Sequence, residues 1–198
     1  SLMPLLSLSA SLSLTQGVEN DVREAVSAME ALRDRIGRDV PSDRNPAKQM
    51  AQRLRGRLPV IYGAGPLLEV AHRWKTQLNE SGKVWCFYEE LPEIHHNAII
   101  GYDLPSAIAK ATTVVFLRSK DLVHPRVQLR YDFTRGLLEK AGVDVAELEP
   151  EGRSALAQMM HLVLFGDYVS AYLAFLYGVD PTPTTVIDEL KAWLARQD

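Results

Sequence analysis

Two short stretches of the chain carry side chains that could move protons. Residues 73–83, RWKTQLNESGK, hold the carboxylate of Glu80, and residues 91–97, LPEIHHN, hold the imidazole of His96, sixteen positions further on. Each side chain lies where a predicted helix or strand should end and a loop should begin. A carboxylate and a histidine that face one cleft are a minimal set of groups for general acid–base catalysis. We therefore expect a proton-transfer site if Glu80 and His96 share a cleft.

Each of these residues also has an ordinary structural interpretation. Glu80 falls in the last turn of its predicted helix, where exposed carbonyl groups disfavour a negative charge, but it could simply be a solvated glutamate before a glycine cap. His95 and His96 are adjacent and point to opposite sides of an extended chain, so at most one should face a given cleft. Either could instead be a surface or hydrogen-bonded loop histidine.

Further positions carry weaker chemical signals. The YGAG turn at 62–65 follows a predicted strand and opens a helix, so it could hold an anion on its backbone amides or be a plain tight turn. Lys191 lies on the last predicted helix, and its simplest interpretation is a lysine on a solvated face. We expect Asp167, inside a long apolar stretch, to be a paired buried carboxylate or to cap a break at Gly166. Cys86 is the single cysteine and no His-x3-His pattern occurs, so we expect no metal and no cofactor.

The composition excludes several classes of protein. The chain has 198 residues, 46% of them hydrophobic, and a formal net charge of −3. This suffices for one well-buried domain, and it lacks the basic footprint that nucleic-acid binding needs. A single cysteine forbids an internal disulfide and indicates a reducing, cytoplasmic setting. Residues 159–177 are apolar enough to raise the question of a membrane span, but Asp167 near the middle favours a buried helix, so we expect no membrane partner.

Hydrophobic periodicity predicts alternating strands and helices. Helical spacing with start and stop signals predicts helices at about 20–36, 46–55, 66–81, 133–140, 154–177 and 183–194. Apolar, β-branched runs predict strands at about 58–62, 83–88, 111–119, 127–131 and 143–148, and the alternation at 6–14 suggests a strand or a packed helix. Such alternation indicates a parallel sheet covered on both faces, with sites at the carboxyl ends of the strands. The last helix should bury the face formed by Val186, Ile187, Leu190, Trp193 and Leu194.

Five stretches taken together resemble one family. NPAKQMA, PVIYGAG, RWKTQLNESGK, LPEIHHN and GDYVSAYLAFLYGVDPTP occur in the order typical of bifunctional phosphoglucose/phosphomannose isomerases, which carry two sugar isomerase (SIS) domains in tandem. The resemblance runs from about Asn45 to Lys191. It implies an α/β fold, a three-layer α/β/α sandwich on a parallel, mainly five-stranded, flavodoxin-like sheet, with added N-terminal and C-terminal helices. Residues 45–198 would be the C-terminal SIS domain, and residues 1–44 a helical segment that links it to a missing N-terminal SIS domain.

The resemblance also implies roles for residues. Glu80 matches the family's catalytic base, which transfers a proton between C1 and C2 through a cis-enediol. His96 matches a ring-opening histidine that reaches the site from the neighbouring subunit, and Lys191 matches a lysine near the ring oxygen. The implied reaction converts glucose 6-phosphate, and by the same chemistry mannose 6-phosphate, to fructose 6-phosphate. The implied enzyme is a homodimer with a shared active site that uses no metal.

One part of the family pattern is missing from this sequence. In the family, the Ser/Thr-rich loops that grip the sugar phosphate, and a catalytic arginine, belong to the first SIS domain. Members also often carry Asn at the position of His95 and an acidic residue at that of Ala98. We therefore expect these 198 residues alone to be nearly inactive. Two alternatives stay open: a non-catalytic SIS module that senses a sugar phosphate, and a purely structural or dimerisation domain.

Overall fold

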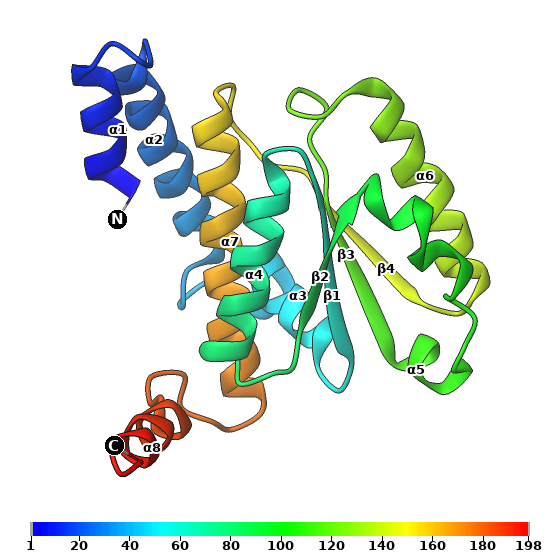
Figure 1. Cartoon of the computed structure of the whole chain (residues 1–198). Helices are drawn as coiled ribbons and strands as arrows, with labels where there is room; N and C mark the ends of the chain where they lie inside the picture. The colour runs from blue at the N-terminus through cyan, green and yellow to red at the C-terminus, as the bar shows by residue number, and fades with distance from the viewer. Residues whose placement is uncertain (1, 198) are drawn as a thin grey trace.

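A computed structural model describes residues 2–197 of the chain. It consists of four strands, eight helices and short connecting segments (Figure 1). The strands are β1 Leu58–Ala64, β2 Phe87–Leu91, β3 Thr112–Leu117 and β4 Asp144–Leu148. The helices are α1 Leu2–Ser11, α2 Val18–Ile36, α3 Pro46–Leu54, α4 Leu67–Glu80, α5 Ser106–Ala111, α6 Pro125–Lys140, α7 Ala155–Leu176 and α8 Thr185–Leu194.

The four strands form one parallel sheet with the order β2-β1-β3-β4. Figure 1 shows α2, α3, α4 and α7 on one side of the sheet and α5 and α6 on the other. Each side has its own hydrophobic core, since Ile61 and Val115 of the sheet pack toward α4 and α7, whereas Tyr62 and Phe116 pack toward α6. The predicted three-layer sandwich with a parallel sheet is therefore confirmed.

The expectation of a fifth strand is wrong for the residues that the structure describes. Residues 127–131, which we predicted as a strand, lie inside α6. Pro125 occupies the first turn of this helix, and the ring of His124 accepts a hydrogen bond from the backbone N–H of Arg126. Tyr131, Thr134 and Leu138 are then buried at helical spacing, so the period of the buried positions outweighs the strand propensity of VQLRY. The predicted edge strand at 143–148 is confirmed as β4.

The Leu/Ser alternation near the N-terminus forms a helix, not the strand that its period suggested. Within α1, Ser9 and Ser11 donate hydrogen bonds from their hydroxyls to the carbonyls of Leu6 and Leu8, three residues earlier. Among the described residues no strand lies beside this segment, so the chain satisfies its backbone groups locally. Figure 1 shows α1 lying alongside α2 at the outer end of the molecule.

Helix α8 differs from its prediction in the environment of its apolar face. It begins at Thr185, and none of its residues is buried. The five side chains that we expected to be covered are 47% to 77% exposed: Val186, Ile187, Leu190, Trp193 and Leu194. Figure 1 shows why, because α8 projects from the body of the molecule below α7. The amphipathic pattern is real, but no element within residues 2–197 covers it.

Helix α7 is long and apolar enough to span a membrane by length and composition. In the structure it instead packs among α2, α3 and α4, as a core helix does. Gly166 of α7 faces the ring of Trp74 of α4. Trp74 is fully buried and donates a 2.8 Å hydrogen bond from Nε1 to the carbonyl of Leu162. This contact fixes the position of α4 against α7.

We expect Gly166→Ala to destabilise the fold. A Cβ atom there would lie 2.5 Å from atoms of the Trp74 ring, and such overpacking costs about 1–3 kcal/mol of unfolding free energy. Gly136→Ala is the matched control, because it is also a helical glycine but has open space around it. It should raise stability by up to about 1 kcal/mol, since alanine favours a helix. Urea unfolding measures both, and equal stability of the two variants would contradict the packing.

Candidate active site

Glu80 is the last residue of α4, and its side chain is exposed. Since α4 runs back from the carboxyl end of β1, Glu80 lies at the amino edge of the sheet, where a short loop leads into β2 (Figure 1). Asn79 holds this loop by accepting a 2.8 Å hydrogen bond from the backbone N–H of Cys86. From α7, the hydroxyl of Ser170 donates a 2.8 Å bond to the carbonyl of Gln77. The helix end that carries Glu80 is therefore held from two sides.

Glu80 lines a cavity of about 510 Å³ between the end of α4 and the start of α8. The side chain of Lys83 bridges the two, because its Nζ donates to the carbonyls of Glu80 and Pro183. The α8 side of the cavity is formed by residues 183–187. Lys191 lies one turn beyond them, exposed and 3.3 Å from the carboxylate of Asp188. The structure thus brings Glu80 close to the helix that carries Lys191.

His96 lies at the opposite edge of the sheet. It ends the short 3₁₀ helix Glu93–His96, which follows the carboxyl end of β2, and its ring is exposed. Because β2 has five residues and a strand rises about 3.3 Å per residue, the two edges are roughly 16 Å apart. Within one copy of the chain, His96 therefore does not face the cavity that Glu80 lines. Sequence reasoning placed candidate sites at the carboxyl ends of strands, but Glu80 lies at the other end.

His95 is directed inward, unlike its neighbour His96. Its Nε2 lies 2.8 Å from the hydroxyl of Thr134 and its Nδ1 lies 3.0 Å from the guanidinium of Arg130, both on α6. An arginine can only donate, so Nδ1 accepts and the proton of the neutral ring sits on Nε2. Burial, and then the positive charge of Arg130, lower the pKa of His95 below its ordinary value. His95 therefore anchors the His96 segment to α6 as a neutral imidazole.

The remaining sequence candidates have packing roles. In the YGAG turn, a side chain at Gly63 would collide with the backbone of Leu67, and Gly65 adopts a φ of +54° that favours glycine. Asp167 is paired as predicted, 3.3 Å from Arg73, but it is half-buried and not buried, and this partial burial raises its pKa. It caps no helix break, since α7 continues past Gly166. Burial raises the pKa of the Cys86 thiol to about 12, so this thiol is a packing group.

Sequence reasoning placed one further acidic side chain, Glu89, at a carboxyl strand end but gave it no role. Glu89 on β2 is half-buried beside Tyr62 of β1, its partner in register, and burial raises the pKa of Glu89. The hydroxyl of Tyr62 lies 3.2 Å from that of Tyr102. The available sequence signal was that Glu89 directly follows the strand predicted at 83–88. Among residues 2–197 no three His, Cys, Asp or Glu side chains are grouped as a metal site would need.

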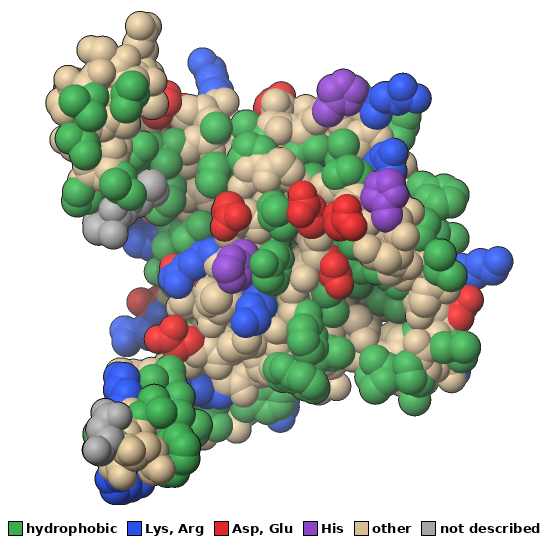
Figure 2. Space-filling view, viewed as in Figure 1, with side chains coloured by type: hydrophobic (Ala, Val, Ile, Leu, Met, Phe, Trp, Pro, Cys, Tyr) green, Lys and Arg blue, Asp and Glu red, His purple; other side chains and the backbone are tan. Residues whose placement is uncertain are grey.

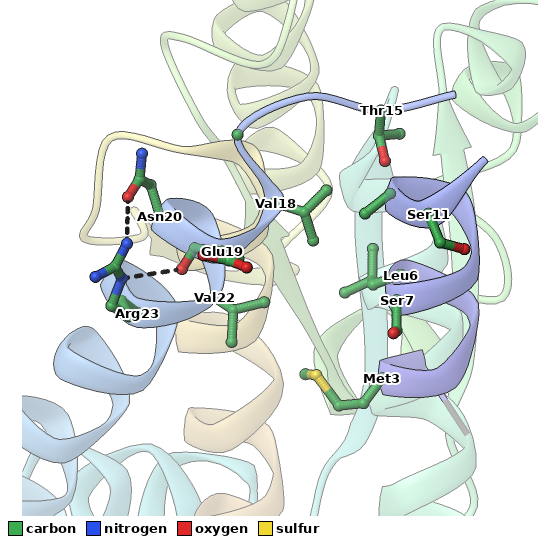
Figure 3. A pocket seen from close by; sticks show the side chains of 12 residues that line it. Met3, Leu6, Ser7, Ser11, Thr15, Val18, Glu19, Asn20, Val22 and Arg23 are labelled. Atoms are coloured by element: carbon green, nitrogen blue, oxygen red, sulfur yellow. Dashed lines mark hydrogen bonds between the residues drawn. The ribbon is translucent and has the colours of Figure 1, made fainter. Parts of the chain in front are cut away.

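A larger hollow of about 870 Å³ lies between α1 and α2. Figure 3 shows Met3 and Leu6 of α1 facing Val18 and Val22 of α2 across it. The one cation at its rim among the lining residues, Arg23, already donates to Asn20 and to a backbone carbonyl. This hollow contains no imidazole. It is the groove of a loosely packed helix pair, and the cavity at Glu80 remains the candidate active site.

A family model and two similar curated proteins indicate the same family. The family described as the bacterial phospho-glucose isomerase C-terminal SIS domain matches residues 43–194. A bifunctional phosphoglucose/phosphomannose isomerase of Caldicellulosiruptor bescii is 38% identical over 98% of this chain and 58% of its own length. One of Aquifex aeolicus is 36% identical over 85% and 52%. The chain spans about half the length of these curated relatives.

A solved structure shows the same fold. The crystal structure of a glucose-6-phosphate isomerase-like protein from Thermus thermophilus superposes with a TM-score of 0.72 and 27% sequence identity. The match covers 86% of this chain and 57% of that one. The arrangement of strands and helices around Glu80 and His96 is therefore that of a known SIS fold.

The environment of His95 gives a test that needs no substrate. Replacing Arg130 with Met removes the positive charge beside Nδ1, so the pKa of His95 should rise toward its ordinary value while staying below it, because burial persists. Arg126→Met, an exposed arginine on the same helix, should leave the pKa of His95 unchanged. Titration of the imidazole C–H signals by NMR measures both. An unchanged midpoint in Arg130→Met would contradict the contact.

Proposed function

The chain belongs to the bacterial phosphoglucose isomerase C-terminal SIS domain family, and we propose that it supplies the catalytic base of a phosphoglucose/phosphomannose isomerase. Its substrates are glucose 6-phosphate and mannose 6-phosphate, and its product is fructose 6-phosphate. The observation that supports this proposal best is the exposed carboxylate of Glu80, which lines a cavity on a helix end held by hydrogen bonds. Residues 45–198 form the SIS domain, and residues 1–44 the helical connection to another domain.

The proposed reaction moves one proton between neighbouring carbons. Glu80 removes the proton from C2 of the open-chain aldose while O1 gains a proton, which leaves a cis-enediol. Glu80 then returns its proton to C1 while O2 loses its proton, which gives the ketose. The carboxylate suits this task because it is accessible from the cavity and accepts no hydrogen bond from the described residues. Lys191, on the helix beside the cavity, is proposed to lie near the ring oxygen. His96 transfers a proton during ring opening.

Glu80 and His96 lie at opposite edges of the sheet, so one copy of the chain cannot provide both at one cavity. We therefore propose a homodimer in which His96 of one copy serves the Glu80 cavity of the other. The neutral, anchored His95 supports this arrangement, because it holds the adjacent His96 in place on the outside of α6. Holding a catalytic side chain in the orientation that the reaction needs lowers the entropic part of the activation barrier.

We expect this chain alone to be a poor catalyst. It lacks the Ser/Thr-rich loop that would hold the sugar phosphate, and lost positioning should lower kcat/KM by at least ~100-fold. The comparison is a chimaera that adds the part of the Caldicellulosiruptor bescii relative that this chain does not match. Conversion of fructose 6-phosphate to glucose 6-phosphate, followed with a coupled assay, measures both. Equal activity of the isolated chain would refute the division of labour between the domains.

In the active chimaera, Glu80→Gln should lower kcat by about 10²–10⁴-fold, because the base is lost. Its stability should stay unchanged, since the side chain is exposed. Glu30→Gln, an exposed glutamate on α2, is the matched control and should keep full activity. Full activity of Glu80→Gln would remove Glu80 as the base.

A mixing experiment tests the shared site. Glu80→Gln and His96→Ala chimaeras should each be inactive, but mixed after unfolding and refolding they should regain about one quarter of normal activity. Half of the dimers would then be mixed, and each mixed dimer would have one intact site of two. Recovery of no activity, with both variants folded and dimeric, would contradict a site built from two copies.

A further inference from the structure

Helix α8 is joined to the rest of the molecule by few contacts. None of its residues is buried, and Figure 2 shows it as a lobe set apart from the body at the lower left. Among residues 2–197, a single hydrogen bond ties residues 180–197 to an earlier part of the chain, and Lys83 donates it to the carbonyl of Pro183. The orientation of α8 against the cavity at Glu80 therefore depends on one side chain.

The loop that follows α4 places Lys83 for this contact. Its Nζ also donates a 2.7 Å hydrogen bond to the carbonyl of Glu80, one of the carbonyls that the end of a helix leaves without a partner inside the helix. Gly82 lets the loop lie against α4, because a Cβ atom there would be 2.7 Å from the carbonyl oxygen of Leu78. An ammonium group has three donors and a positive charge, so it can bind two carbonyls at once and suits the negative end of the α4 dipole.

The backbone of Lys83 is strained. Its φ of +54° lies in the left-handed region, which residues with a side chain such as lysine adopt only rarely. A glycine would adopt the same backbone without strain. Strained residues persist where the surrounding structure imposes them, and they gather at functional sites. Because the side chain of Lys83 also lines the cavity at Glu80, the strain favours a role for the lysine side chain itself.

We propose that Lys83 is a positioning residue, which holds the start of α8 against the end of α4 and so sets the place of Lys191 beside the Glu80 cavity. Lys191 lies eight positions after Pro183, roughly 12 Å along the helix. A rotation of α8 by about 10° at its start would therefore move Lys191 by roughly 2 Å. This inference rests on the proposed function for the role of Lys191, but not for the contact between α4 and α8.

Distances between spin labels on this chain test the contact without substrate. Labels at Glu69→Cys of α4 and Glu189→Cys of α8, two exposed positions, should give a narrow distance distribution by double electron–electron resonance. The native Cys86 is buried and should stay unlabelled. Lys83→Met should broaden the distribution, whereas Lys83→Arg, which keeps a charged donor, should leave it narrow. Lys140→Met, an exposed lysine in the last turn of α6, is the matched control and should also leave it narrow.

Lys83→Gly separates this contact from the stability of the fold. It relieves the backbone strain, so the urea midpoint should not fall, yet the distribution should broaden as in Lys83→Met. A distribution that stays narrow in folded Lys83→Gly and Lys83→Met, or one that is already as broad in the unchanged chain, would overturn the proposal.

Turnover by the active chimaera tests the consequence for catalysis. Lys83→Met should lower kcat by up to about 100-fold, because a displacement of about 1 Å at a reacting group can cost that much, and Lys83→Arg should restore most of the rate. Adding Lys83→Met to Lys191→Met should lower kcat no further, since Lys83 acts through Lys191. Effects that multiply would show that Lys83 acts separately and would overturn its positioning role. Full activity of Lys191→Met would refute the catalytic consequence, whereas the spin-label distances would still decide the contact itself.

Discussion

The direction of α4 governs everything else at the candidate site. In a parallel sheet, the helix between two neighbouring strands must carry the chain back from the carboxyl edge to the amino edge. Glu80 ends that helix and the His96 segment follows the next strand, so the two residues are separated by the full length of β2. No change of side-chain rotamer removes this separation, because the order and direction of the strands and helices determine it. A proton-transfer site that uses both residues must therefore take them from different copies.

The position of Glu80 depends on the packing of α4 against α7. The residues of this contact take no part in the proposed proton transfer. Trp74 sits against Gly166, and its indole N–H satisfies the carbonyl of Leu162, so α4 is fixed along α7. The last turn of α4 is then held by Ser170 and its following loop by Asn79. A carboxylate at the end of such a helix needs little reorganisation to reach a substrate. The apolar α7, whose composition alone suggests a membrane span, thus acts as the support for the site.

Sequence reasoning identified the parts of the fold that local signals determine. The helices with clear caps and the buried strands β1 and β3 follow from side chains near each other in sequence. The helix at 127–131 was missed because VQLRY has the side chains of a strand, while its burial follows the period of a helix that starts at Pro125. Glu80 and His96 were named as candidates from their motifs, but their placement at opposite edges of the sheet depends on chain direction, which no local motif contains.

Helix α8 shows the limit of such reasoning most clearly. Its amphipathic pattern correctly predicts a helix with an apolar face. Such a pattern does not identify the surface against which that face packs. Each large apolar side chain contributes about 1.5–3 kcal/mol when it is fully buried, and the face of α8 realises little of this within residues 2–197. The bridge from Lys83 to Pro183 is then the main tie between α8 and α4. The position of Lys191 relative to Glu80 therefore rests on fewer contacts than the position of Glu80 itself.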